Sequence, residues 1–138
     1  MDKKTDYTEL LRLADEARAA SYSPYSGISV GAALLTKSGK VYTGANIENA
    51  SYSPTVCAER VAIFTAVHAG EHEFSAIAIA GGHAGEHGKD AFMPCGVCRQ
   101  VISEFADENF VIVTALGDSY EAHTLAELLP HSFTKAKL

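Results

Sequence analysis

Residues 57–60 read CAER and residues 94–100 read PCGVCRQ, and together they hold all three cysteines of the chain. Each stretch opens a segment with apolar residues at the three- and four-residue spacing of one helix face. At the start of a helix, free N–H groups and a partial positive charge favour a thiolate over a thiol. Cys95 and Cys98 are three residues apart on one face of their helix, so both can bind the same ion.

Cys57 supplies a third sulfur ligand from the other helix. Zinc with three protein ligands keeps its fourth tetrahedral position for water, which is the pattern of a catalytic site. Glu59 lies two residues beyond Cys57 in the same first turn, where its carboxylate can act as general base and general acid. Three thiolates and one Zn²⁺ leave a net negative charge, which Arg60 can offset by donating hydrogen bonds to sulfur.

Other interpretations of these residues remain open. A C-x-x-C pair alone is as typical of a redox dithiol or half of a zinc ribbon as of a catalytic site. Glu59 alone can be a carboxylate that stabilises a helix start, and Arg60 an exposed surface charge. A zinc-stabilised binding module needs a fourth ligand to close the metal, and no matching Cys or His is apparent. A dithiol redox protein does not need Cys57 or Glu59.

The pattern of the whole chain predicts a three-layer α/β domain around one mixed five-stranded sheet. We expect residues 1–138 to form a single domain, which is the usual number for this length. Strand order does not follow from the pattern. The elements expected along the chain are a helix over 5–20, strands over 28–36 and 40–47, a helix from 57 to about 70, a strand over 75–81, a helix over 94–106 that has Pro94 at its start, strands over 110–116 and 120–124, and a helical turn over 125–129.

Composition narrows the classes of function. The formal charge of −6 disfavours binding to a nucleic-acid backbone, which requires a dense basic face. No run approaches the ~20 apolar residues of a membrane span, and MDKKTDYTELL lacks the apolar region of a secretory signal. We therefore expect a cytoplasmic protein with a small-molecule partner, in which three thiols do not form a disulfide framework.

Several motifs in order resemble one family over nearly the whole chain. They are YSPYS at 22–26, VGAALL at 30–35, NIENASY at 46–52, CAER, PCGVCRQVISE at 94–104 and ELLPHSF at 127–133. The sequence is similar to the small, single-domain, three-cysteine cytidine deaminases. The resemblance implies zinc-dependent hydrolytic deamination of cytidine and 2′-deoxycytidine to uridine and 2′-deoxyuridine, with release of ammonia, in pyrimidine salvage. It also implies one zinc per protomer and a homotetramer whose sites are completed across subunits.

The resemblance assigns roles to individual residues. Cys57, Cys95 and Cys98 match the zinc ligands, and Glu59 matches the proton shuttle. Asn46 and Glu48 match the pair that hydrogen-bonds the ribose 3′-hydroxyl. The remaining matches are the Ala58 N–H and the Met93 carbonyl, which read the base edge, and Tyr52 and Phe133, which reach a neighbouring subunit's site.

Two features depart from the family pattern. Ile28 stands where the family generally has a phenylalanine that packs against the base, and isoleucine cannot stack as a ring does. The segment 81–93 is longer than typical and contains His83 and His87. It is either a glycine-rich surface loop, a lid or a second metal-binding tract. Within the deaminases, the alternative substrate is a modified cytosine nucleoside or an antibiotic such as blasticidin S, which Ile28 leaves open.

Overall fold

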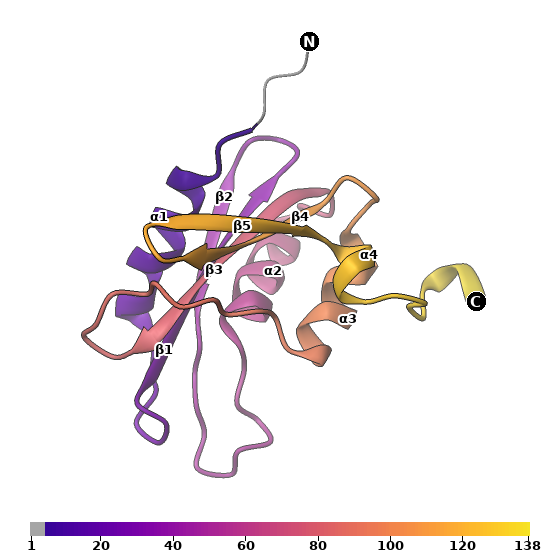
Figure 1. Cartoon of the computed structure of the whole chain (residues 1–138). Coiled ribbons are helices and arrows are strands. Elements are labelled where there is room, and N and C mark those ends of the chain that lie inside the picture. Colours follow the sequence, from indigo (N-terminus) through magenta and orange to yellow (C-terminus); the bar gives the residue numbers. More distant parts are fainter. Residues whose placement is uncertain (1–4) are drawn as a thin grey trace.

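The computed structural model describes residues 5–138, which form one five-stranded sheet with helices on both faces (Figure 1). In chain order the elements are α1 (Thr8–Ala17), the 3₁₀ turn η1 (Arg18–Ala20), β1 (Ile28–Thr36), β2 (Val41–Ala45), α2 (Ala58–His68), β3 (Phe74–His83), α3 (Gly96–Phe105), β4 (Val111–Leu116), β5 (Ser119–Thr124), α4 (Leu125–Leu128) and the 3₁₀ turn η2 (Lys135–Lys137).

The strand order in the sheet is β2-β1-β3-β4-β5. β3 and β4 are parallel, and every other neighbouring pair is antiparallel, so the predicted mixed sheet is confirmed. α1 packs on one face of the sheet, and α2 and α3 pack on the other (Figure 1). α3 connects the parallel strands β3 and β4, because a parallel pair requires a crossover connection.

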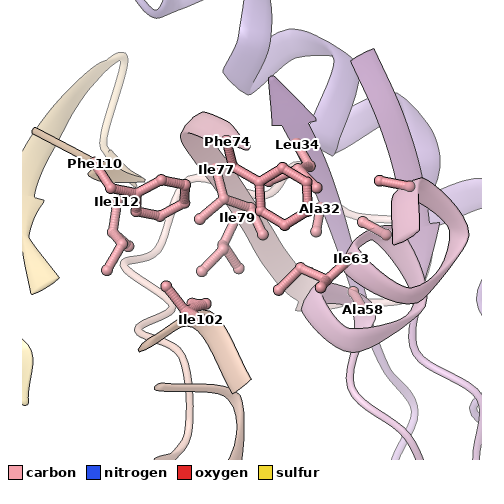
Figure 2. Packing of buried hydrophobic residues seen from close by; sticks show 12 residues of the cluster. Ala32, Leu34, Ala58, Ile63, Phe74, Ile77, Ile79, Ile102, Phe110 and Ile112 are labelled. Atoms are coloured by element: carbon pink, nitrogen blue, oxygen red, sulfur yellow. The ribbon is translucent and has the colours of Figure 1, made fainter. Parts of the chain in front are cut away.

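Each face of the sheet has its own hydrophobic core. Isoleucines and phenylalanines fill the larger core beneath α2 and α3, where Phe74, Ile77 and Phe110 lie among the labelled side chains (Figure 2). The core beneath α1 consists mostly of alanines and lets that helix come close to the strands. A Cβ on Gly31 would lie 2.0 Å from the Ala14 carbonyl oxygen, so the glycine of VGAALL is what permits this approach.

Several boundaries differ from the predictions, and β2, for example, ends at Ala45, two residues before the predicted end. α1 begins at Thr8, and its last predicted turn is the 3₁₀ helix Arg18–Ala20. β3 runs on to His83, two residues past the predicted end, because Ile28 and Ser29 of β1 pair with it there. Pro94 does not start the third predicted helix: Cys95 is its N-cap in extended conformation, and the helix begins at Gly96.

The end of α2 agrees with the sequence. Gly70 follows the C-cap with a φ of +94°, and its N–H donates to the Val67 carbonyl while the Glu71 N–H donates to the Ala66 carbonyl. This is the glycine-terminated helix end that the position of Gly70 predicts. Across residues 5–138, no helix is long and apolar enough to span a membrane.

Candidate active site

The three cysteines come together at the N-terminal ends of α2 and α3. Cys57 is the N-cap of α2, Cys95 is the N-cap of α3, and Cys98 lies in the first turn of α3. Their sulfur atoms all lie within 4.8 Å of one another, and Cys57 Sγ is 3.8 Å from Cys95 Sγ. Among residues 5–138, this is the one group of three or more metal-ligating side chains with such spacing.

The spacing of the sulfurs fits a zinc ion. Two thiolates that bind one tetrahedral zinc at ~2.3 Å lie about 3.8 Å apart, which is the separation of Cys57 and Cys95. The donor set of three thiols suits zinc and leaves one position of the tetrahedron open. No other cysteine exists in the chain to close that position.

The thiols differ in their affinity for protons. The hydrogen bond from the Cys98 thiol lowers the pKa of Cys57 to about 5, with a further contribution from Arg60. Donating this hydrogen bond to Cys57 raises the pKa of Cys98, as does its burial. Arg60 Nη2 donates to Cys57 Sγ at 3.4 Å, and this contact raises the pKa of the guanidinium. The side chains alone therefore favour one thiolate, and binding all three sulfurs to a cation requires the release of further protons.

Glu59 lies in the first turn of α2 and is only 4% exposed. Burial raises the pKa of its carboxyl group to about 7, against the lowering effect of a backbone hydrogen bond. A carboxyl group that titrates near neutrality can both accept and return a proton, which is the requirement for a shuttle.

A pocket of about 210 Å³ opens beside these groups. It is lined by Val30, Asn46, Thr55, Val56, Cys57, Ala58, Glu59, Ile79, Phe92, Met93 and Cys95. The lining thus combines polar groups with aliphatic and aromatic side chains. This combination is typical of a site for a planar polar ligand.

Hydrogen bonds fix the Asn46 side chain at the edge of this pocket. Its Oδ1 accepts from the Val30 N–H at 2.9 Å and from the Ser21 hydroxyl at 2.5 Å. Its Nδ2 donates to the Ile28 carbonyl at 2.9 Å. The amide therefore has one orientation, with one N–H left for a ligand.

Glu48 lies in a neighbouring pocket of about 310 Å³ with Tyr25, Ser26, Tyr52 and Thr55. Its carboxylate accepts from the backbone N–H groups of Tyr25 and Ser26 and from the Ser26 hydroxyl, and the hydroxyl contact lowers its pKa. Thr55 lines both pockets, so the two are adjacent.

The predicted ligand-binding residues divide into two groups. Ala58 and Met93 line the pocket beside the thiols. Ile28, Tyr52 and Phe133 do not line it. Ile28 begins β1 two residues before Val30, so it faces the same side of the sheet. The Ile28 carbonyl accepts from Nδ2 of Asn46, which lines the pocket, and the role of Ile28 at the base stays a prediction.

Tyr52 and Phe133 are turned toward solvent, with exposed fractions of 71% and 61%. Tyr52 has a φ of +64°, and its ring packs edge-on against Tyr25 at 6.2 Å between centroids. The Phe133 carbonyl accepts from the Gln100 side chain at 2.8 Å.

Sequence reasoning missed Phe92, which is the aromatic side chain of the pocket. A Cβ on Gly81 would lie 2.7–2.8 Å from three atoms of the Phe92 ring, so the ring lies over a strand position that carries no side chain. The Phe92 N–H donates to the buried Thr114 hydroxyl at 2.7 Å. The signal available in the sequence was an aromatic residue two positions before Pro94.

The segment predicted as a loop over 81–93 is shorter and more strongly held than expected. Gly81, Gly82 and His83 belong to β3 and pair with β1. Beyond them, Lys89 forms an ion pair with Asp118 at 2.6 Å and accepts a hydrogen bond from the Gly117 N–H. Within the described part of the chain, His83 and His87 join no group of three metal-ligating side chains, so the second metal-binding tract is not found.

Comparison with known proteins agrees with this site. A family profile described as the cytidine and deoxycytidylate deaminase zinc-binding region matches residues 4–114. A cytidine deaminase of Sporosarcina psychrophila is 44% identical over 134 residues, covering 96% of this chain and 95% of that protein. One from Halalkalibacterium halodurans is 46% identical over 131 residues, covering 94% and 95%. A blasticidin-S deaminase of Bacillus cereus is 34% identical over 130 residues, covering 92% and 91%.

Comparison with solved structures identifies the same family. The crystal structure of a cytidine deaminase from Burkholderia pseudomallei superposes with a TM-score of 0.83 at 40% identity, covering 94% of this chain and all of that one. The chain belongs to the zinc-binding cytidine and deoxycytidylate deaminase family. Over nearly its full length it is similar to the cytidine deaminases of that family. The family, enzyme class and zinc cofactor predicted from the sequence are confirmed.

Proposed function

We propose that this protein deaminates cytidine and 2′-deoxycytidine by hydrolysis, as an enzyme of pyrimidine salvage, giving the uridine nucleosides and ammonia. The observation that carries the proposal is a buried carboxyl group, Glu59, in the same pocket as two of three clustered thiols. The pocket holds about 210 Å³, and its apolar wall of Val30, Ile79 and Phe92 suits a flat base.

Different residues of the site would bind the metal, transfer protons and compensate charge. Cys57, Cys95 and Cys98 would hold one zinc per protomer, which when bound acts as a Lewis acid that makes water nucleophilic near neutral pH. Glu59 would take one proton from the attacking water and deliver it to N3 of the base. It would then take the second proton from the hydroxyl now on C4 and deliver it to the departing amine, which leaves as ammonia while C4 becomes a carbonyl. The Glu59 pKa of about 7, raised by burial, allows both transfers at neutral pH. Arg60 would offset part of the thiolate charge through its contact with Cys57.

Groups at the pocket wall would hold the base. Ala58 is the first residue of α2, so its N–H has no partner within the helix and is free to donate to the base carbonyl. The Met93 carbonyl would accept from the amino group. Phe92 would contact the face of the base, and Ile28, whose carbonyl accepts from Asn46 Nδ2, would pack beside it.

Asn46 and Glu48 would recognise the ribose. The free N–H of Asn46 would donate to the 3′-hydroxyl, and the Glu48 carboxylate would accept from it. Because Glu48 stays ionised well below neutral pH, it also repels the phosphate of a nucleotide. These roles support an unphosphorylated nucleoside as the substrate.

We further infer a homotetramer of single-domain chains, spanning residues 1–138, in the cytoplasm. The exposed aromatic residues Tyr22, Tyr25, Tyr52 and Phe133 support the assembly, because apolar rings at 51–71% exposure favour burial against a partner. Tyr52 and Phe133 would complete a neighbouring subunit's site. Three free thiols fit a reducing compartment. Light scattering tests the assembly, and fractionation of the native cells tests the compartment.

A second candidate substrate is a modified cytosine nucleoside or blasticidin S. The isoleucine at position 28 supports this alternative, because it cannot stack on the base as the family's phenylalanine does. The similarity to a blasticidin-S deaminase is consistent with it.

One experiment separates these functions. Zinc content is measured per protomer, and the loss of ultraviolet absorbance is followed separately with cytidine, 2′-deoxycytidine, CMP and blasticidin S. One zinc with turnover of both nucleosides and not of CMP supports the proposal. One zinc with turnover of blasticidin S alone supports the alternative, and absence of bound zinc contradicts both.

A further inference from the structure

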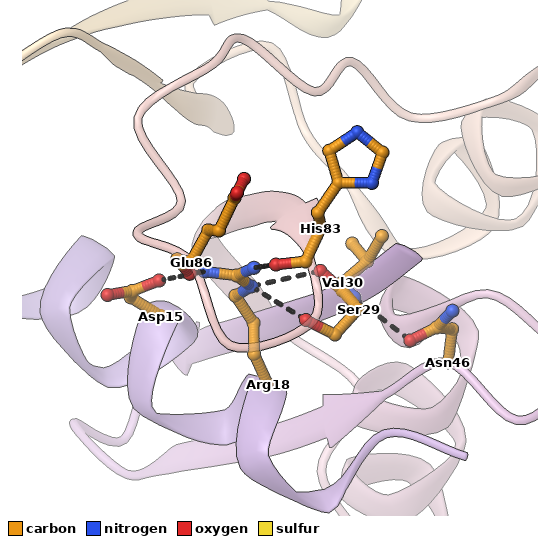
Figure 3. A network of polar contacts seen from close by, with 7 residues as sticks. All are labelled: Asp15, Arg18, Ser29, Val30, Asn46, His83 and Glu86. Atoms are coloured by element: carbon orange, nitrogen blue, oxygen red, sulfur yellow. Dashed lines mark hydrogen bonds and ion pairs between the residues drawn. The ribbon is translucent and has the colours of Figure 1, made fainter. Parts of the chain in front are cut away.

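Arg18 is a charged side chain in the interior, at 7% exposure, in the 3₁₀ turn that follows α1. Its Nε donates to the Ser29 carbonyl at 2.9 Å and to the Ser29 hydroxyl at 3.2 Å. Nη1 donates to Asp15 Oδ1 at 2.9 Å and to the Glu86 carbonyl at 2.8 Å, and Nη2 donates to the His83 carbonyl at 3.1 Å. Figure 3 shows the guanidinium between Asp15 of α1, Ser29 of β1 and the stretch from His83 to Glu86.

The contacts use four of the five N–H donors of the side chain, which gives Arg18 a fixed orientation. Asp15 is the anion in the network, and its side chain is 41% exposed, so ion pairing alone does not explain why the charge is buried. Three of the acceptors are backbone carbonyls: Ser29 in β1, His83 at the end of β3 and Glu86 after it. The guanidinium therefore ties the end of α1 to β1, which supplies Val30 to the pocket, and to the end of β3.

One of these contacts leads directly to Asn46. The Ser29 carbonyl that accepts from Arg18 and the Val30 N–H that donates to Asn46 Oδ1 belong to the same peptide group. A peptide group is planar, so fixing its C=O direction also fixes its N–H direction. A charged donor on the carbonyl also polarises the group and strengthens the hydrogen bond made by its N–H. Arg18 thus acts on the Asn46 amide through one rigid unit (Figure 3).

The other contacts hold the end of β3 and the residues that follow it. His83 and Glu86 precede the segment that supplies Phe92 and Met93. The backbone there is close to the network: a Cβ on Gly88 would lie 2.7 Å from Asp15 Oδ1 and 2.9 Å from Arg18 Nη1. The same guanidinium therefore also holds the end of β3 and the residues just after it, none of which lines the pocket beside the thiols.

We propose that Arg18 is a positioning residue for recognition of the sugar, acting through the 29–30 peptide group on Asn46. This inference rests on the proposed role of Asn46 at the ribose 3′-hydroxyl. Arg18 does not line the pocket beside the thiols, so it acts on binding of the sugar and leaves the proton transfers of Glu59 intact.

The test compares cytidine with 2′,3′-dideoxycytidine, which lacks the 3′-hydroxyl. Arg18→Lys keeps the charge but cannot reach the carbonyls as a planar fork. We expect its KM for cytidine to rise about fivefold to tenfold, with kcat within about twofold of the parent, since one oriented hydrogen bond is lost. The KM for 2′,3′-dideoxycytidine should stay close to the parent value. Equal changes for both nucleosides, or no change for either, overturn the proposal.

Two further variants show whether a change in KM reflects a loss of folding. Gly88→Ala disturbs the guanidinium without removing it and should show the same preferential loss for cytidine at a smaller size. Arg12→Lys changes an arginine on the same helix whose ion pairs with Glu9 and Glu16 are exposed, and it should leave both KM values unchanged. Melting temperatures measured alongside separate a general loss of stability from the loss of sugar recognition.

A double-mutant cycle with Asn46→Ala tests the role of Asn46 at the sugar separately from the effect of Arg18 on Asn46. If Asn46→Ala abolishes the preference for cytidine over the dideoxynucleoside, and Arg18→Lys adds nothing in that background, the relay is supported. If Asn46→Ala leaves the preference unchanged, the proposed role of Asn46 fails and the inference fails with it. If Asn46→Ala removes the preference while Arg18→Lys alone keeps it, only the inference fails.

Discussion

The sulfur atoms of Cys57 and Cys95 lie 3.8 Å apart, although the two residues are separated by 38 positions and cap different helices. The sheet order brings them together, because α2 and α3 cover the same face. Two helix N-termini thus converge on one point, and both contribute partial positive charge where thiolates must be stabilised.

Removing any one of the thiols should remove the metal. We expect Cys57→Ala, Cys95→Ala and Cys98→Ala each to lose stoichiometric zinc and turnover, because two sulfurs do not complete the site. Cys98 is fully buried and Cys95 is exposed, so Cys98→Ala should also lower the melting temperature of the zinc-free protein more than Cys95→Ala does. Zinc assay and thermal denaturation measure both effects. A variant that keeps one zinc per chain would remove that cysteine from the ligand set.

Glu59→Gln should keep the fold and the zinc while kcat falls by a factor of about 10³ or more. The amide is nearly the same size as the carboxyl group but cannot carry the proton between water and base. Steady-state kinetics with cytidine and a zinc assay on the same sample provide the check. Turnover close to the parent value would assign the proton transfers to another group.

Arg60→Ala should have a smaller effect, a fall in kcat of about tenfold. The variant loses the donor to Cys57, but the backbone N–H groups at two helix starts continue to stabilise the sulfurs. Arg12→Ala, which changes an exposed arginine, serves as the control. If both variants match the parent, Arg60 has no role at the sulfurs.

Phe92→Leu should raise the KM for cytidine about fivefold to tenfold, because leucine offers no aromatic face to the base. Phe110→Leu is the matched control: it truncates a ring in the same core that does not line the pocket. The control should lower the melting temperature without changing KM. An unchanged KM in a folded Phe92→Leu variant would show that the base is held elsewhere.

Gly31→Ala should destabilise the protein by about 1–3 kcal/mol or more, because the new methyl group would lie 2.0 Å from a backbone oxygen of α1. Backbone atoms cannot swing aside as a side chain can. Gly96→Ala is the comparison, since a Cβ there meets nothing within 4 Å and its φ is not in the left-handed region. Urea denaturation of the two zinc-free variants should show a loss for Gly31→Ala alone.

The parts of the site that could be predicted from the sequence are local. Cys57 and Glu59, and likewise Cys95 and Cys98, lie within one turn of a helix start, so spacing alone places them relative to each other. Phe92 and Arg18 could not be found this way, because their roles depend on Gly81, Ser29 and His83, which only the pairing of β1 with β3 brings near.

The fold class could be predicted for a similar reason. Apolar periodicity identified all five strands, but the order β2-β1-β3-β4-β5 depends on contacts between distant segments that no local pattern records. Ile28 shows the same limit at one residue. Its place in a motif predicts contact with the base, whereas its place at the first position of β1 does not put it among the residues that line the pocket, so the contact stays a prediction.

The position of β3 between the two halves of the sheet has a consequence for assembly of the protein. Its neighbours are β1 on one side and β4 on the other, and its chain runs on into the segment that leads to Cys95. Cys57 can therefore meet Cys95 and Cys98 only after these distant pairings have formed. Since the unfolded chain holds no preformed site, zinc should bind late during folding, and its binding free energy should stabilise the whole domain.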